Sequence, residues 1–407
     1  MGGSGQQRVK NTTNLTGWAL RSFYDLARIT SGQVDPREEP YRAMVLVAPD
    51  HIQTGSGRID QRSTAEQQGA ISGKYLVKNG EIIYSKIRPN LQKLAVATED
   101  CLCSADMYPV EARENISSIF LKYLMLSAPF TEFATSVSVR SGMPKINREE
   151  LAYFSALVPE NLKEQEAIAE ALSDADALIE GLERLIAKKR LIKQGAMQEL
   201  LTGRRRLPGF SEEWIEHKLS EISSFGKGKG LPKSDVKLSG DIPCIHYGSL
   251  FREQPTIIES LKTFTFDFLG ALHSQAGEVL MPTSDVTPSG LAVASCILSD
   301  GVLLGGDILI IRPHRDRLDG RFLASYIRQD RNQIMELVSG TTVFHIYSSD
   351  MARFKIKLPP LDEQQSIVSL LTDMDAEIQA LESRLKKAHT IKEGMMQNLL
   401  TGRIRLV

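Results

Sequence analysis

The chain has 407 residues, 42% of them hydrophobic and 24% charged, a size and composition that allow two or three soluble globular domains. Its 49 Lys and Arg are balanced by 50 Asp and Glu, so the net charge of −1 does not indicate a nucleic-acid-binding protein, and a basic surface would have to be local. The four cysteines have neither the spacing of a zinc site nor the density of a disulfide framework, which favours reduced thiols in a cytoplasmic protein.

The N-terminal part of the chain is expected to hold a short tail followed by one domain. Residues 1–14 begin with Gly and Ser and lack the apolar core of a signal peptide, so we expect a disordered tail or one added by cloning. Residues 15–157 are expected to form a first α+β domain. Its predicted strands are 44–47, 81–87 and 94–98, and its predicted helical stretch is 119–135.

A long helix is predicted in the central region, residues 158–207. Asn161 with Glu164 fits a capping box at its start, and Gly203 is typical of a helix end. The helix would contain about 38 residues and be about 57 Å long. Its apolar residues alternate in spacing between four and three, which is the seam of a coiled coil: Ile168, Leu172, Ala175, Ile179, Leu182 and Ile186.

The second half of the chain repeats this order. Residues 208–357 are expected to form a second α+β domain, and residues 358–407 a second long helix with Asp362 and Gln365 as a capping box. The strands expected in this domain are 242–247, 278–282 and 303–311, and its helical stretch is 322–338. The second seam is Ile367, Leu371, Met374, Ile378, Leu381 and Leu385.

The two helical regions are copies of one another. Residues 162–207 and 361–406 are identical at 24 of 46 positions when the sequence is shifted by 199 residues. A seam this long must be buried, and the nearest partner is the other copy within the chain. We therefore predict an α+β protein in which two domains alternate with two helices that pair as an antiparallel coiled coil with approximate two-fold symmetry. A plain coiled-coil spacer or dimerisation device is the alternative.

Both helical regions carry motifs that resemble one known family. The C-terminal copy opens with Pro-Pro-Leu-Asp-Glu-Gln at 359–364 and closes with Met-Gln-Asn-Leu-Leu-Thr-Gly at 396–402. The central copy has the related segments 159–165 and 197–203, although its first segment lacks the double proline. As a duplicated set, these segments resemble the specificity subunits of type I restriction-modification enzymes.

The resemblance implies a non-catalytic subunit that addresses a complex to DNA. Each domain would be a target-recognition domain for half of a bipartite sequence in double-stranded DNA, and the helix pair would set the spacer. Two adenine-N6 methyltransferase subunits that use S-adenosylmethionine would dock on this chain, and restriction subunits driven by ATP with Mg would join them. No cofactor is expected on this chain itself, and no membrane role is expected.

The sequence contains no catalytic motif of its own. It lacks the Asn/Asp-Pro-Pro-aromatic motif that holds a flipped adenine. The run Gly-Lys-Gly-Lys-Gly at 226–230 lacks the Gly-Lys-Ser/Thr ending of a phosphate loop and is better explained as a flexible basic loop. The seven histidines show no metal-ligand spacing.

Candidate DNA contacts are sought where loops carry basic, hydroxyl or amide side chains. Lys and Arg can hold phosphates, whereas paired hydrogen bonds from Arg and Asn can read guanine and adenine. For any single residue, an ordinary surface or turn role is the alternative. The candidates are Lys86, Arg88, Asn90, Arg140, Ser141 and Lys145 in the first domain, and Lys227, Lys229, Lys233, His246, Tyr247, Ser284, Thr287, Thr341, Thr342, His345 and Tyr347 in the second.

Two other functions remain open at this point. One is a free-standing duplicated DNA-binding or scaffold protein, which would need no methyltransferase partner. The other is an unrecognised enzyme, which would show turnover in isolation. Complex formation with a methyltransferase separates the first from a specificity subunit.

Overall fold

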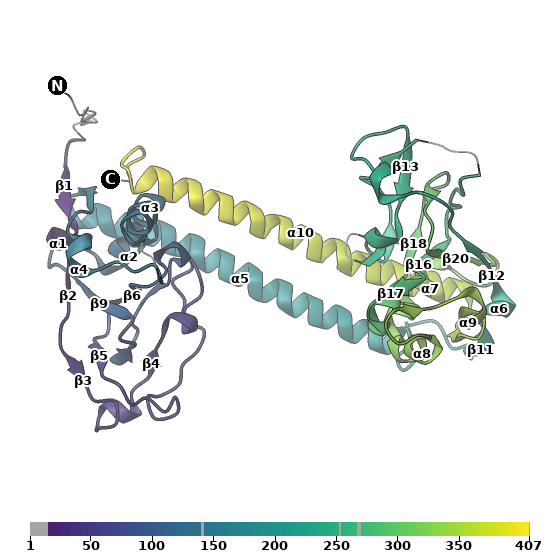
Figure 1. Ribbon diagram of the computed structural model, residues 1–407, viewed down its shortest axis with the longest axis horizontal. Coiled ribbons are helices and arrows are strands. Elements are labelled where there is room, and N and C mark those ends of the chain that lie inside the picture. The colour runs from purple at the N-terminus through teal and green to yellow at the C-terminus, as the bar shows by residue number, and fades with distance from the viewer. Residues whose placement is uncertain (1–14, 140–141, 252–253, 267–269, 407) are drawn as a thin grey trace. The chain divides into compact units, whose positions relative to one another are not determined.

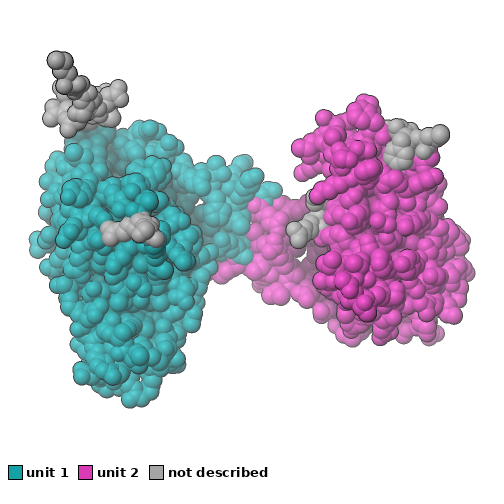
Figure 2. All heavy atoms as spheres, in the orientation of Figure 1, with its two compact units in different colours: residues 1–183, 383–407 teal, residues 184–382 magenta. Residues whose placement is uncertain are grey.

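The computed structural model describes residues 15–139, 142–251, 254–266 and 270–406. The expected N-terminal tail lies outside the described residues. The chain divides into two compact units (Figure 2): unit 1 comprises residues 1–183 and 383–407, and unit 2 comprises residues 184–382. Both divisions fall inside long helices, so each long helix belongs partly to each unit.

The two predicted long helices are present. They are α5 (Leu162–Leu200) and α10 (Leu361–Leu399), each of 39 residues. The turns that follow them contain Gly203 and Gly402, which adopt φ values of +69° and +71°. This left-handed conformation ends a helix at low cost only in glycine, so the prediction of both helix ends is confirmed.

α5 and α10 run antiparallel within each unit (Figure 1). In unit 2, Lys189 and Lys193 of α5 form ion pairs with Glu377 and Asp375 of α10, so later positions in one helix meet earlier positions in the other. In unit 1, Asp176 pairs with Lys392 in the same sense. The predicted antiparallel pairing is therefore confirmed.

The predicted seam is the side of the helices that is shielded from solvent. Ala175, Met374, Leu381 and Leu385 are half-buried. The other predicted seam residues are buried: Ile168, Leu172, Ile179, Leu182, Ile186, Ile367, Leu371 and Ile378. Burial of this seam is what stabilises helices that would be marginal alone in water.

The first globular region belongs to unit 1. Its main sheet has the order β2-β9-β6-β7, a second sheet has the order β3-β5-β8-β4, and β1 pairs with β10. All the pairs are antiparallel except β4 with β8. Its elements are β1 (Trp18–Ser22), α1 (Phe23–Leu26), β2 (Ala27–Ile29), β3 (Gln33–Val34), η1 (Tyr41–Ala43), β4 (Leu46–Val47), η2 (Pro49–His51), β5 (Lys74–Val77), β6 (Ile82–Ser85), η3 (Pro89–Leu91), β7 (Leu94–Val96), β8 (Cys101–Cys103), β9 (Met107–Ala112), α2 (Ser118–Leu126), α3 (Ala128–Val137), α4 (Arg148–Leu151) and β10 (Ser155–Pro159).

The second globular region belongs to unit 2. Its main sheet has the order β12-β20-β16-β18-β14, a smaller sheet has the order β15-β13-β19, and the pairs β11-β22 and β17-β21 stand apart. Its elements are β11 (Ile215–Lys218), α6 (Leu219–Ile222), β12 (Ser223–Lys227), η4 (Lys233–Asp235), β13 (Ile242–Ile245), η5 (Tyr247–Phe251), β14 (Ile257–Ile258), β15 (Phe264–Thr265), β16 (Val279–Pro282), β17 (Ser284–Asp285), η6 (Pro288–Leu291), β18 (Ser295–Ile297), β19 (Leu303–Leu304), β20 (Ile308–Pro313), α7 (Gly320–Gln329), α8 (Arg331–Leu337), β21 (Phe344–His345), α9 (Ser348–Met351) and β22 (Lys355–Leu358).

The two regions share one fold. The strands β2, β9, β6 and β7 of the first sheet follow the same spatial and chain order as β12, β20, β16 and β18 of the second. In both, two helices follow the last strand of the main sheet, and the strand before the long helix pairs with the first strand of the region. The second region adds β14 at the edge, parallel to β18.

Each core is completed by the end of a long helix. Leu399 and Leu400, at the end of α10, pack into the first core with Phe120. Leu200 and Leu201, at the end of α5, pack into the second core with Phe322. The helices are therefore continuous with the globular cores and not simple linkers.

Two predicted helices are each divided in two. The stretch 119–135 is interrupted at Ser127, whose hydroxyl donates to the Leu124 carbonyl and accepts from the Phe130 amide, ending α2 and starting α3. The stretch 322–338 is interrupted at Asp330, whose carboxylate accepts from the Gln333 amide and starts α8. The predicted strand 303–311 is likewise two strands, β19 and β20, separated by Gly305 and Gly306.

The predicted capping boxes are wrong. Asn161 does cap α5, because its side chain accepts from the Lys163 amide at 3.0 Å, but Glu164 does not complete the box. Asp362 lies inside α10, which begins at Leu361. Glu164 and its repeat equivalent Glu363 are instead buried in polar clusters.

These two clusters have the same composition. In unit 1, Glu164 accepts two hydrogen bonds from Arg405, at 2.7 and 2.6 Å, and one from Trp18 Nε1 at 3.2 Å. In unit 2, Glu363 accepts two bonds from Arg206, both at 2.6 Å, and one from Trp214 Nε1 at 3.2 Å. A carboxylate this buried is stable only with such partners, so each cluster locks a helix start to a helix end.

Candidate nucleic-acid interface

The first candidate surface in unit 1 is formed by two loops that are far apart in the sequence. The Arg88 amide donates to the Pro144 carbonyl at 2.8 Å, and the Ile146 amide donates to the Lys86 carbonyl at 2.9 Å. Ile87 and Lys145 form an isolated antiparallel bridge between these two bonds. The structure therefore brings together the predicted residues Lys86, Arg88 and Lys145, and it places Asn90 in η3 directly after them.

The loop that carries Arg88 is held in an unusual backbone conformation. Arg88 and Gln92 both have positive φ values, +47° and +48°, at the two ends of η3. The Gln92 side chain donates to the Leu126 carbonyl at 3.0 Å and to Thr131 Oγ1 at 2.8 Å, which ties the loop to α2 and α3. The loop is therefore a fixed feature of unit 1.

Lys86 has a different environment from Arg88. Its ammonium lies 5.2 Å from the centre of the Tyr108 ring, and its side chain is half-buried. Burial, followed by the neighbouring charge of Lys145, lowers the pKa of Lys86. Of the two, Arg88 is the exposed side chain and Lys86 mainly supports the loop.

Unit 2 contains the same pair of loops. Ser284 pairs with His345 across β17 and β21, and the Ile346 amide donates to the Thr283 carbonyl at 3.1 Å. The rings of His345 and Tyr347 stack with centroids 5.9 Å apart and an interplanar angle of 11°. By this pairing, Ser284 and His345 occupy the positions of Ile87 and Lys145 in unit 1.

The other predicted residues around these loops are polar and accessible. Thr287 donates from Oγ1 to Asp285 at 2.9 Å, so it mainly stabilises its own loop. Thr341 and Thr342 are exposed in the turn that connects Ser339 to β21. Arg140 and Ser141, the predicted contacts of the equivalent turn in unit 1, lie outside the described residues.

The remaining predicted residues of unit 2 form a second cluster next to this loop. Lys227 lies 3.4 Å from Asp307, whose carbonyl accepts from the Thr283 amide at 2.9 Å. Burial, followed by the nearby charge of Lys233, lowers the pKa of His246, so this imidazole is neutral at neutral pH. The His246 and Tyr247 rings lie 4.6 Å apart. The Lys229 amide donates to the carbonyl of Leu304, which pairs with Ile245, the residue before His246.

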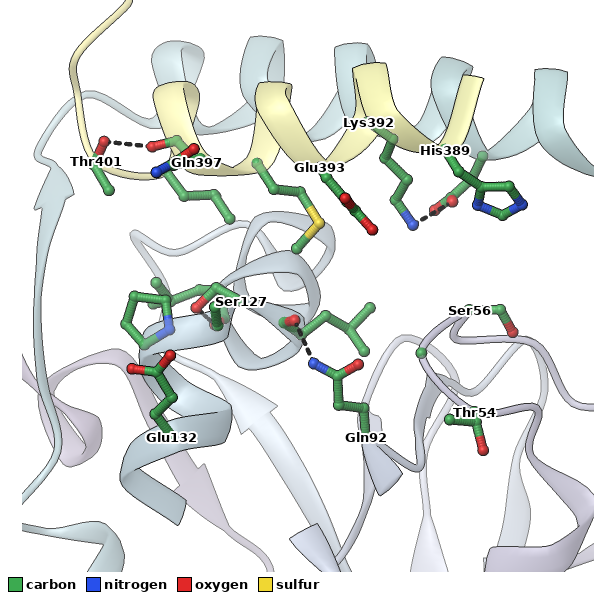
Figure 3. A pocket seen from close by; sticks show the side chains of 18 of the residues that line it. Thr54, Ser56, Gln92, Ser127, Glu132, His389, Lys392, Glu393, Gln397 and Thr401 are labelled. Carbon is green, nitrogen blue, oxygen red and sulfur yellow. Dashed lines mark hydrogen bonds and ion pairs between the residues drawn. The ribbon is translucent and has the colours of Figure 1, made fainter. Parts of the chain in front are cut away.

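A groove in unit 1 was not predicted from the sequence. It has a volume of about 960 Å³ and lies between the loop 53–58, the junction of α2 and α3, and the helices α5 and α10 (Figure 3). Leu124, Leu157 and Met396 contribute apolar walls, and acidic side chains line it as well: Glu132, Glu180, Glu183 and Glu393. Basic side chains of Arg58, Lys392 and Arg403 also line it, so the groove carries charges of both signs.

One partly buried charge cluster borders this groove. Asp176 lies 2.5 Å from Lys392 and 3.7 Å from Lys122, and it accepts a hydrogen bond from the Tyr123 hydroxyl at 2.7 Å. Burial lowers the pKa of Lys122. The cluster connects α2, α5 and α10. In unit 2, Asp375 and Lys193 repeat only its central pair, and sequence reasoning missed it because its members come from three separate segments.

The described residues include no group of three or more His, Cys, Asp or Glu side chains that could hold a metal ion. All four cysteines are free and buried. Burial raises the pKa of Cys101 and Cys296 to about 12, so these thiols are protonated at neutral pH and are poor nucleophiles.

None of the described helices combines the length and the apolar character that crossing a membrane requires.

Comparison with known proteins gives matches along most of the chain. Residues 17–188 and 211–389 match the family model described as the type I restriction modification DNA specificity domain. The chain is 34% identical over 169 residues to the EcoDI specificity subunit of a type I restriction enzyme from Escherichia coli, a match that covers 42% of this chain and 37% of that subunit. It is 25% identical over 356 residues to the putative MjaX specificity subunit from Methanocaldococcus jannaschii, covering 82% of this chain and 80% of the relative.

A solved structure has the same fold. The chain resembles the S subunit of a type I restriction-modification system from M. genitalium with a TM-score of 0.60 and 15% sequence identity. The superposition covers 96% of this chain and 97% of that one.

Proposed function

This chain belongs to the family of type I restriction-modification DNA specificity proteins, and we propose that it selects the DNA target of a modification and restriction complex. Each globular region would contact one half of a bipartite site in double-stranded DNA. One observation carries this proposal. Two regions of one fold present different side chains at equivalent positions of their loop pairs, with Arg88 and Lys145 in one and Asp285 and His345 in the other. A common scaffold with different surface residues is suited to reading two different half-sites.

The proposed role of the helix pair is to fix the distance between the two half-sites. Each long helix belongs to both units, so a change in helix length would alter both. A rigid antiparallel pair is a better spacer than a flexible linker because its length is set by the number of residues.

Protein partners would supply the chemistry. We propose that two adenine-N6 methyltransferase subunits dock on this chain and use S-adenosylmethionine, and that restriction subunits use ATP and Mg, whereas this chain binds none of these cofactors. Exposed apolar side chains on the long helices support docking of this kind. They are Leu178, Leu185, Leu191, Ile192 and Ile391. A cytoplasmic location is part of the same proposal.

Co-expression with an adenine methyltransferase subunit tests the proposal. The expected product is a stable complex of two methyltransferases with one copy of this chain, and sequencing of modified bases in the host DNA should reveal methylated adenines in one bipartite motif. Methylation without sequence preference, or no complex, would contradict the proposal. Specific DNA binding by the isolated chain with no methyltransferase interaction would instead support a free-standing DNA-binding protein.

A further inference from the structure

Most basic side chains of the first globular region are engaged within the protein. Of the Lys and Arg residues in 15–139 and 142–157, only Arg88 and Lys145 have side chains with no ion pair, hydrogen bond or ring contact to another described residue. The engaged side chains and their partners are Arg21 with Glu160, Arg28 with Glu111, Arg37 with Asp35, Arg42 with Glu66, Arg58 with Asp60, Arg62 with Glu99, Lys74 with Ser72, Lys78 with Asp100, Lys86 with Tyr108, Lys93 with Ile52, Arg113 with Tyr24, Lys122 with Asp176 and Arg148 with Thr30.

These two cations are neighbours although 57 residues separate them in sequence. Ile87 pairs with Lys145, and the Arg88 amide bonds to the carbonyl of Pro144, the residue before Lys145. The positive charge that the composition does not reveal is therefore concentrated at one place. This place is the loop pair described above.

The backbone at Arg88 is held in a conformation that arginine does not favour. Its φ of +47° and ψ of +58° lie in the left-handed region, where a side chain with a Cβ atom is strained. The Arg88 amide is fixed by Pro144, its carbonyl accepts from the Leu91 amide at 2.9 Å, and the following Pro89 is buried. Gln92 has the same strain, but its side chain is used to hold the loop, whereas the Arg88 side chain is exposed. Strain at a residue with no internal role points to a contact with a ligand.

The chemistry of the two side chains suggests different roles. The planar guanidinium of arginine presents paired donors that match O6 and N7 of guanine in the major groove, and a backbone fixed at its base limits where that group can reach. Lysine is a point charge suited to a phosphate. We propose that Arg88 reads a guanine in the half-site contacted by unit 1 and that Lys145 neutralises an adjacent phosphate.

Unit 2 differs at the equivalent position. When the two loop pairs are aligned through the Ile146 and Ile346 hydrogen bonds, Asp285 of unit 2 is at the position that Arg88 occupies in unit 1. The Asp285 carboxylate accepts from Thr287 Oγ1 and from the Val286 amide, so it is occupied within its own loop. The guanine reader is thus specific to unit 1, and the two half-sites differ at this position.

The inference rests on the proposed function and is tested in the complete complex with methyltransferase subunits. The bipartite target of the wild type is first determined from modified-base sequencing. Replacement of Arg88 by glycine removes the side chain while relieving the backbone strain, so the variant should fold. We expect preference for guanine to be lost at one position of one half-site, with binding to the original target weakened about tenfold to a hundredfold and every other position read as before.

Two further variants separate base reading from general attraction. Lys145→Gln should weaken binding to all sequences alike and lower the slope of affinity against salt concentration by about one unit. Arg62→Gln, a change at a surface arginine already paired with Glu99, should leave both readouts unchanged.

The outcomes distinguish the two levels of the proposal. A wild-type complex without a specific bipartite target would remove the proposed function itself. A normal wild-type target together with an Arg88→Gly variant that keeps every base preference, or that weakens all sequences equally, would overturn only the assignment of Arg88.

Discussion

Arg405 and Glu164 are 241 residues apart in sequence, and the guanidinium of Arg405 donates two hydrogen bonds to the Glu164 carboxylate, at 2.7 and 2.6 Å. The same guanidinium donates to the Thr16 carbonyl at 2.7 Å. In unit 2, Arg206 makes the equivalent bonds to Glu363 and to the Glu212 carbonyl. Each unit thus contains its own copy of this polar cluster. In unit 2 the cluster joins residues of one continuous segment, whereas in unit 1 it joins residues from distant segments of the chain.

Loss of the buried carboxylate should destabilise the protein. Glu363→Gln would leave Arg206 without its ionic partner beside a buried amide, and we expect the free energy of unfolding to fall by about 2 to 3 kcal/mol. Glu382→Gln, at the more exposed pair with Arg190, is the matched control and should cost less than about 1 kcal/mol. Urea unfolding of each variant measures the difference, and equal effects would show that the cluster contributes nothing special.

A glycine inside α5 and the glycine in the turn after it should respond in opposite directions to alanine. Gly203 has a positive φ, and an added Cβ would lie 3.2 Å from the Trp214 ring, so Gly203→Ala should destabilise by about 1 to 2 kcal/mol. Gly195 lies inside α5 with open space around its Cα, so Gly195→Ala should stabilise by up to about 1 kcal/mol. Thermal melts of both variants provide the test, and a stable Gly203→Ala protein would refute this account of the helix end.

The cyclic order of the repeats predicts that the chain tolerates circular permutation. Consider a chain with residue 406 linked to residue 15 and opened between residues 208 and 209. In this chain unit 1 would be one continuous segment, as unit 2 now is, and unit 2 would be formed by two segments. We expect its free energy of unfolding to lie within about 1 kcal/mol of the wild type. Opening between residues 187 and 188, inside α5, is the control and should cause a large loss of stability. Similar unfolding curves for both permutants would argue against the cyclic arrangement.

Lengthening both long helices should lengthen the DNA spacer. Insertion of one heptad after Ala187 and a matching heptad after Lys386 keeps the seam in register and adds about 10.5 Å, or about three base pairs. Modified-base sequencing should show both half-sites unchanged and the gap between them increased. An unchanged gap would remove the spacer role from the helix pair.

The two long helices could be predicted in position and pairing but not in capping, and the globular regions only in outline. The apolar periodicity of α5 and α10 depends on residues close in sequence, and their duplication is visible when the sequence is compared with itself, so both helices and the seam from Ile168 to Leu385 could be predicted. Helix breaks at Ser127 and Asp330 were missed because a single capping side chain outweighed an apolar pattern that continues through it.

The polar clusters and the loop pairs could not be derived from local patterns. Glu164 looked like a capping residue because its real partners, Trp18 and Arg405, lie far away in sequence. The repeat did contain a signal for this cluster. Its Glu and its Arg are both present in each copy, as Glu164 and Glu363 and as Arg206 and Arg405, which are 199 residues apart. The sequence marks Arg88 and Lys145 only as basic residues of two separate loops, and the fold shows that they are neighbours.

The division of unit 1 between both halves of the polypeptide has a consequence for biosynthesis. Residues 184–382 leave the ribosome as one uninterrupted segment, so unit 2 can begin to fold during translation. The first globular region supplies some partners of residues 162–183, but those from α10 and the turn after it are synthesised some two hundred residues later, in the segment 383–407. Until then, the side of the nascent α5 that α10 will cover stays exposed, and a chain whose synthesis stops early would display its apolar residues to chaperones and proteases.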